Sequence, residues 1–145
     1  MASRIAYFDT SVLLKRYFEE PGSVLAASVL RRHVVTTSSI APVEAISAIC
    51  RRRDSGELTP KVFTYLSQRL YRDRSRWELV EVTQKVLDVA EELVDRFNVR
   101  TLDAVHLSSG HLLQSALGTR LQFVTADARQ REAAEALSFE AVWVA

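Results

Sequence analysis

Apolar and polar positions follow two different periods along the chain. Short apolar runs bounded by turn or polar residues predict strands at 4–8, 34–37, 77–82, 121–125 and 140–144. Between them, apolar residues recur at helical spacing, which predicts helices at 11–19, 23–32, 41–56, 60–74, 84–97, 102–117 and 128–137. Strands that alternate with helices in this way predict an α/β fold with a mostly parallel sheet.

Threonine, serine and proline residues mark where several of these helices begin. Thr59, Thr83 and Thr101 precede helical segments as N-caps, and Ser11 can cap the first helix in the same way. Pro42 stands in the first turn of its helix, where the missing N–H costs little. Since no repeat or linker interrupts the pattern, a single domain over 1–145 is expected.

The composition indicates the cellular location that is expected for the chain. Hydrophobic residues make up 48% of the 145 residues, enough for one real core, and no apolar run is long enough to cross a bilayer. The N-terminal segment lacks the apolar centre of a signal peptide. Because Cys50 is the only cysteine, an internal disulfide is excluded, and a cytoplasmic location without a membrane is expected.

Two aspartates follow predicted strands near opposite ends of the chain. Asp9 comes directly after the strand at 4–8, and Asp127 follows the strand at 121–125 after one intervening residue. In doubly wound sheets, ligands bind outside the carboxyl ends of the strands, at the point where the strand order reverses. If these two strands are neighbours, the two carboxylates converge at such a point.

Two further acids lie on predicted helices. Glu44 has small, mostly apolar neighbours at helical spacing and no basic partner among them, so its carboxylate needs a cation from elsewhere. Asp103 falls in the first turn of its helix, where the helix dipole favours an anion and Arg100 could pair with it. Taken alone, each acid is explained more readily as a structural residue.

Together the four acids form an all-oxygen set without a cysteine or a paired histidine nearby. Hard divalent ions such as Mg²⁺ or Mn²⁺ prefer such ligands, and clustered carboxylates repel one another unless a cation compensates. A site of this kind suits the hydrolysis of a phosphodiester by a metal-activated water. The convergence of the four side chains in space is therefore the prediction that the structure has to test.

Four parts of the chain are similar to those of a known family. They are FDTSVLLKRY at 8–17, Glu44 early in its helix, TLDAVHLSSG at 101–110 and FVTADARQREAAEALSFEAVWV at 123–144. In order and spacing the chain resembles the PIN-domain ribonucleases, and within them the VapC-type toxins of toxin–antitoxin pairs, over essentially its whole length.

The resemblance implies a PIN-like three-layer fold, with a five-stranded sheet between helices, and Mg²⁺- or Mn²⁺-dependent endoribonuclease activity. The family's acidic positions, which would be the catalytic and metal-binding residues, are Asp9, Glu44, Asp103 and Asp127. Ser11 and Thr125 would orient the carboxylates or water. The resemblance also implies an RNA substrate, a homodimer and a cognate antitoxin on a separate chain.

Basic residues and histidines give weaker signals. Lys15 and Arg16 lie one helical turn beyond Asp9 and are predicted to contact RNA phosphates. The arginines at 51–53 end a helix, where cations suit the dipole, and this interpretation is preferred over a contact with RNA. The arginine-rich stretch 69–76 fits a solvated helix end and an RNA contact equally well. His106 lies three residues after Asp103 and could serve near the site, but a packed helix residue is the preferred prediction.

Other functions compete with this interpretation. Haloacid dehalogenase phosphatases need an aspartate two residues after the first one, where this chain has Ser11. Receiver domains need paired acids at one strand end, which the sequence does not show. Two alternatives stay open: a PIN-fold nuclease of RNA processing that has no antitoxin, and a non-catalytic binding module stabilised by metal.

Overall fold

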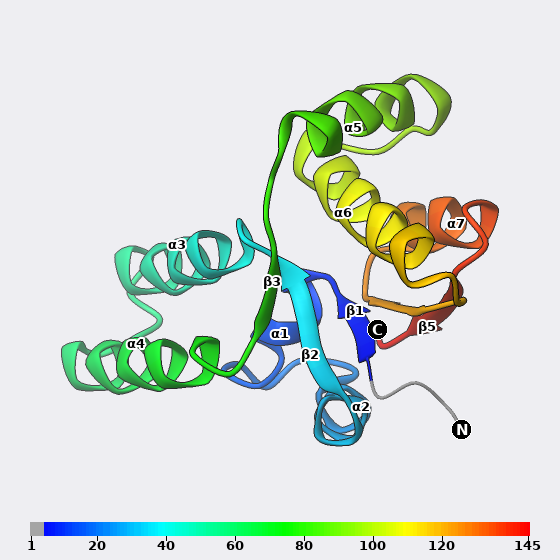
Figure 1. The fold of residues 1–145 in the computed structure, drawn as a ribbon. Helices are drawn as coiled ribbons and strands as arrows, with labels where there is room; N and C mark the ends of the chain where they lie inside the picture. The colour runs from blue at the N-terminus through cyan, green and yellow to red at the C-terminus, as the bar shows by residue number, and fades with distance from the viewer. Residues whose placement is uncertain (1–4) are drawn as a thin grey trace.

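The computed structural model describes residues 5–145, in which five strands alternate with seven helices (Figure 1). The strands are β1 (Ile5–Phe8), β2 (Val34–Ser38), β3 (Glu78–Val80), β4 (Gln122–Thr125) and β5 (Glu140–Trp143). The helices are α1 (Thr10–Leu14), α2 (Ser23–Arg32), α3 (Ala41–Asp54), α4 (Pro60–Arg74), α5 (Gln84–Arg96), α6 (Thr101–Leu117) and α7 (Ala128–Ala136). None of these helices, over residues 5–145, combines the length and apolar character needed to cross a bilayer.

The strands form one parallel sheet in the order β3-β2-β1-β4-β5. β1 lies in the middle of the sheet, with β2 and β3 on one side of it. After β3, the chain passes through α5 and α6 to β4, which lies on the other side of β1 and is followed by β5. β1 and β4 are direct neighbours, with Phe8 opposite Val124. The α/β class is confirmed, the sheet is wholly rather than mostly parallel, and its strand order reverses between β1 and β4.

Alternate residues of the central strands supply two separate cores. Tyr7 and Phe123 pack with α5, α6 and α7 on one face of the sheet. Phe8 and Val124 pack with α1 and α2 on the other face. The α3–α4 pair projects from this body at the left of Figure 1 and encloses a third cluster that includes Ile49. Helices on both faces of the sheet confirm the predicted three-layer arrangement.

Several predicted boundaries are wrong. The first helix ends at Leu14 rather than at 19, because the amides at 15–17 bond to carbonyls three residues back, as in 3₁₀ turns. Asp9 rather than Ser11 caps α1, and Arg100 rather than Thr101 stands at the N-cap of α6. Residue 4, where the first strand was predicted to begin, lies outside the described residues. The third strand is confined to 78–80, because the Trp77 amide bonds to the Arg74 carbonyl in the turn after α4.

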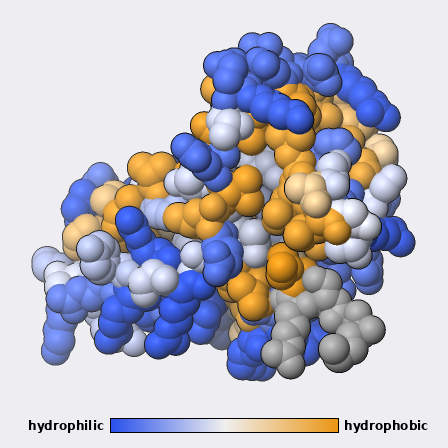
Figure 2. Space-filling model, viewed as in Figure 1, coloured by the Kyte–Doolittle hydropathy of each residue, from blue (hydrophilic) through white to orange (hydrophobic). Residues whose placement is uncertain are grey.

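One face of the molecule carries exposed apolar side chains. Figure 2 shows hydrophobic residues across the middle of the face on which β2 and β3 lie in front, with hydrophilic residues over α4 and α5. Val43 on α3 and Leu79 on β3 are 63% and 44% exposed. β3 stands at the edge of the sheet, and β2 is its one partner among the described strands. An edge strand beside apolar side chains is a common place for another chain to bind.

Gly22 occupies a position where the fold has no room for a side chain. It caps α2 with φ of 84°, and a Cβ there would lie 2.0 Å from the Val144 carbonyl oxygen. Replacing Gly22 by alanine is expected to lower the free energy of unfolding by about 3 kcal/mol, through backbone strain and this contact. Gly56→Ala is the matched control, because Gly56 has φ of 82° but no atom within 4 Å of the added Cβ. Denaturant unfolding measures both, and equal losses would contradict the prediction.

Candidate active site

Asp9 and Asp127 stand at the carboxyl ends of two neighbouring strands. The backbone amide of Asp9 donates to the Val124 carbonyl at 3.0 Å, which extends the pairing of β1 and β4 up to the site. Each aspartate caps the helix that follows: Asp9 accepts from the Ser11 amide at 3.2 Å, and Asp127 from the Gln130 amide at 2.9 Å. The Ser11 hydroxyl also donates to the Asp9 carboxylate. Strand pairing and helix capping therefore fix both carboxylates.

Gln130 contacts both aspartates. The sequence alone did not indicate this residue. Its side chain is buried; Nε2 donates to Asp9 Oδ1 at 3.2 Å, and Oε1 accepts from the Thr125 hydroxyl at 2.6 Å. The Thr125 hydroxyl oxygen accepts in turn from the Asp127 amide at 3.0 Å. Thr125 thus reaches Asp9 through Gln130 and contacts the backbone of Asp127. The three-residue spacing from Asp127 is the one sequence signal that could have indicated Gln130.

Glu44 reaches the same place from α3. Its Oε1 accepts from the Thr10 hydroxyl at 2.7 Å and lies 2.6 Å from Nε2 of His106. The same Nε2 lies 3.7 Å from Asp9 Oδ1, so His106 stands between two of the predicted site carboxylates. The cation that Glu44 was expected to need is therefore supplied by a histidine when its ring is protonated.

His106 is both a packed helix residue, as predicted, and a member of the site. Its side chain is fully buried, and Nδ1 lies 2.8 Å from the Tyr7 hydroxyl. Burial lowers the pKa of His106, but the bond to Glu44 and the charges of nearby carboxylates outweigh burial and raise it. Its position three residues after Asp103, on the same helix face, was the available signal for this role.

Asp103 joins the acidic set from the first turn of α6. Burial and the negative charges of Asp9 and Asp127 raise its pKa to about 6; His106 opposes this increase and Glu44 adds to it. The charges that raise the pKa of Asp103 thus come from the other three acids predicted from the sequence.

Two adjoining cavities open onto this acidic group. One, of about 600 Å³, is lined by Asp9, Glu44 and Asp103. A smaller one, of about 270 Å³, is lined by Asp103 and Asp127. Arg100 and Asp103 line both cavities, so Asp103 stands at the boundary between them. A substrate can therefore reach the acids through these cavities, at the carboxyl ends of the central strands.

The donor chemistry fits a hard divalent cation, although the side chains do not form a closed cage. Within residues 5–145, no three His, Cys, Asp or Glu side chains are already arranged around one point that could hold an ion. Mg²⁺ commonly binds through one or two carboxylates and keeps several waters, so an open carboxylate group suits it. The carboxylates that could supply ligands to such an ion are those of Asp9, Glu44, Asp103 and Asp127, and hydrogen bonds already engage oxygens of Glu44 and Asp9.

The two basic residues predicted to contact RNA line neither acidic cavity. Lys15 is buried, and its ammonium group donates to the Pro21 carbonyl at 2.7 Å and lies 3.9 Å from Glu20. The bond to Pro21 holds Lys15 against the loop after α1. It engages the ammonium group that was predicted to contact an RNA phosphate. Arg16 is exposed.

Comparisons with known proteins show the family of the chain and relatives that share its fold. The model of the PIN domain family matches residues 6–136. The chain is 33% identical over 137 residues to Ribonuclease VapC46 of Mycobacterium tuberculosis, across 94% of this chain and 95% of that protein. A toxin–antitoxin complex from Klebsiella pneumoniae matches with a TM-score of 0.59 and 16% identity, over 86% of this chain and 88% of that one. At such an identity, the structural likeness concerns the fold alone.

Proposed function

Because the chain belongs to the PIN-domain family, we propose that it is a metal-dependent endoribonuclease and the toxin of a VapBC-type toxin–antitoxin system. The observation that carries this proposal is the gathering of four acids around two adjoining cavities where the strand order reverses. Burial and the neighbouring acids also raise the pKa of Asp103. The ribonuclease name of the relative at 33% identity supports RNA as the substrate.

Each acid has a distinct place in the proposed mechanism. Asp9, Asp103 and Asp127 would hold Mg²⁺ or Mn²⁺, which lowers the pKa of the attacking water and stabilises the leaving 3′ oxygen. Ser11 and Gln130 fix the Asp9 carboxylate from two sides through the bonds described above. Glu44 lines the larger cavity, and we assign it to ordering water beside the three aspartates.

Arginines around the acids supply positive partners for the RNA backbone. Arg51 and Arg100 line the larger acidic cavity, and Arg100 and Arg129 line the smaller one. A phosphodiester that approaches four carboxylates needs such charges as well as the metal. We therefore assign the backbone contacts to these arginines in addition to Arg16.

Two protein partners belong to the proposal. A cognate antitoxin on a separate chain is supported by the toxin–antitoxin complex that shares this fold. A second copy of the chain is assigned to the face shown in Figure 2, because the edge strand β3, on which Leu79 is exposed, lies in front on this face beside hydrophobic residues.

Metal removal tests the proposed activity. The purified protein is expected to cleave a mixed pool of cellular RNA with Mg²⁺ or Mn²⁺ and to leave it intact with EDTA, because the acids need the cation to act. Excess Mg²⁺ added after EDTA should restore cleavage, which controls for irreversible denaturation. If the folded protein cleaves no RNA with either metal, the result would favour a non-catalytic binding module. If cleavage persists in EDTA, the result would contradict a mechanism in which the four acids act through a bound metal.

A further inference from the structure

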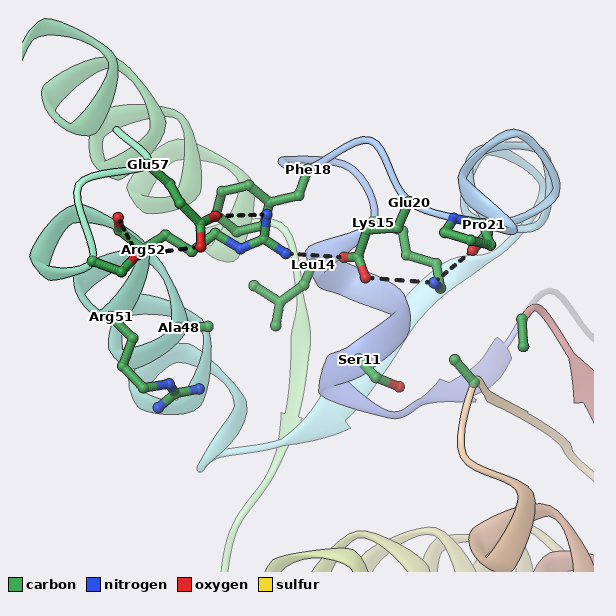
Figure 3. A pocket seen from close by; sticks show the side chains of 13 residues that line it. Ser11, Leu14, Lys15, Phe18, Glu20, Pro21, Ala48, Arg51, Arg52 and Glu57 are labelled. Atoms are coloured by element: carbon green, nitrogen blue, oxygen red, sulfur yellow. Dashed lines mark hydrogen bonds and ion pairs between the residues drawn. The ribbon is translucent and has the colours of Figure 1, made fainter. Parts of the chain in front are cut away.

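A third cavity, here termed the side pocket, adjoins the acidic site between α1 and α3 (Figure 3). Its volume is about 660 Å³, and it shares Ser11, Leu14 and Arg51 with the larger acidic cavity. Pockets that bind small molecules commonly measure about 300–1,000 Å³. The side pocket is therefore large enough for one nucleotide and continuous with the site where the four acids lie.

Ion pairs engage most of the charged side chains of the side pocket. Arg52 lies 3.9 Å from Glu20 and 3.5 Å from Glu57. Lys15 lies 3.9 Å from Glu20 on the other side, so that Glu20 stands between two cations. Figure 3 shows these contacts as one chain that runs across the pocket. These ion pairs hold the charged side chains of the pocket wall in place and neutralise the carboxylates of Glu20 and Glu57.

Arg51 differs from these neighbours. Its side chain is exposed, and Nη1 donates to the Ser47 hydroxyl at 2.8 Å. In the part of the chain that the structure describes, no carboxylate lies within ion-pair distance of Arg51. Figure 3 shows its guanidinium group apart from the chain of ion pairs. Since Arg51 lines both cavities, it offers a free cation at the boundary between them.

The remaining lining of the side pocket suits a nucleobase. Leu14 and Ala48 supply apolar surface, and Phe18 lies buried in the wall behind the Arg52 guanidinium group. The Arg52 guanidinium carbon lies 3.9 Å from the centre of the Phe18 ring, so the two groups are held together as a stack. Bases of single-stranded RNA stack on aromatic rings and on guanidinium planes, and guanidinium groups bind phosphate through two parallel hydrogen bonds.

We propose that the side pocket receives the nucleotide next to the scissile bond, with Arg51 binding the adjacent phosphate. This inference rests on the proposed ribonuclease function and adds which part of the RNA is recognised beside the acids. The nucleotide enters past Ser11 and Leu14, which together with Arg51 line both cavities. The side pocket is then a determinant of sequence preference, separate from the acids that carry out hydrolysis.

The test compares substrates of different length. One oligoribonucleotide spans a bond that the wild-type protein cleaves in the RNA pool, and two trimmed versions lack the flanking nucleotides on one side or the other. Arg51→Gln removes the free cation, and Ala48→Leu fills the side pocket without lining the acidic cavity. Both variants are expected to lower kcat/KM on the full oligonucleotide about tenfold to a hundredfold. On one trimmed version they should match the wild-type protein.

Arg53→Gln is the matched control on the same helix. Arg53 pairs with Asp54 at 2.9 Å, lies over the Phe63 ring, and lines neither cavity, so this variant should keep wild-type kcat/KM on every substrate. Arg51 is exposed, so its variant keeps the test valid even if Ala48→Leu fails to fold.

Three outcomes would overturn the inference. Unchanged kcat/KM of Arg51→Gln on the full oligonucleotide would remove Arg51 from RNA binding. An equal loss on all three substrates would place Arg51 at the scissile phosphate, outside the flanking subsite. Failure of the proposed function itself looks different, because the wild-type protein would then cleave no RNA of any length with metal, and the inference would fall with it.

Discussion

Replacing Asp9 by asparagine is expected to lower the rate of RNA cleavage about a thousandfold or more while the chain stays folded. Asparagine keeps the size of aspartate and caps helices equally well, so α1 should begin as before. It removes a negative charge from the buried position at the end of β1, between Ser11 and Gln130, where the metal is assigned. Transition-state stabilisation by a metal is worth several kcal/mol, and each step of about 1.4 kcal/mol is a factor of ten in rate.

Initial rates on labelled RNA in excess Mg²⁺ measure this effect, with circular dichroism and thermal unfolding to confirm the fold. Asp95→Asn is the matched control, because Asp95 lies exposed on α5 and loses the same charge away from the site. The control should cleave at the wild-type rate. A folded Asp9 variant that also cleaves at the wild-type rate would show that catalysis takes place elsewhere.

The fold was readable from the sequence where its signals are local. Thr59 and Thr83 accept from the amides of Val62 and Val86, as their N-cap prediction requires, and α2 spans the residues that periodicity indicated. The first helix was overextended for a physical reason. Tyr17 and Phe18 recur at helical spacing because they pack into the cluster beneath α3 and α4, although their backbone is no longer helical.

The residues of the candidate site also differ in whether the local sequence indicates them. The four acids could be predicted because a strand end and the first turn of a helix are features of a few neighbouring residues. His106 and Gln130 act through Glu44 and Asp9, which lie 62 and 121 positions away along the chain. Periodicity compares neighbours on one helix face, so it identified His106 as packing and gave no role to Gln130. Positioning residues of this kind become visible when the strand order brings distant segments together.

Removing the imidazole of His106 should give the second large effect on cleavage. His106→Leu deprives Glu44 of a contact at 2.6 Å and the Tyr7 hydroxyl of a partner at 2.8 Å. Groups that hold the residues of a metal site commonly contribute about tenfold to a hundredfold in activity or metal affinity. We expect kcat to fall by that factor and the Mg²⁺ concentration for half-maximal rate to rise. KM for RNA should change little, because the fully buried ring does not reach the substrate.

His106→Gln separates positioning from packing. Its side-chain amide can donate to Glu44 from near the place of the ring Nε2, so this variant should recover much of the lost kcat and of the Mg²⁺ dependence. His111→Leu is the control on α6, because within the described chain its Nδ1 is buried without a hydrogen-bond partner. A purely structural role predicts another result: kcat of both His106 variants would follow their thermal stability, and their Mg²⁺ dependence would equal that of the wild-type protein. That outcome would leave Glu44 positioned by Thr10 and the α3 backbone, with His106 as a core residue alone.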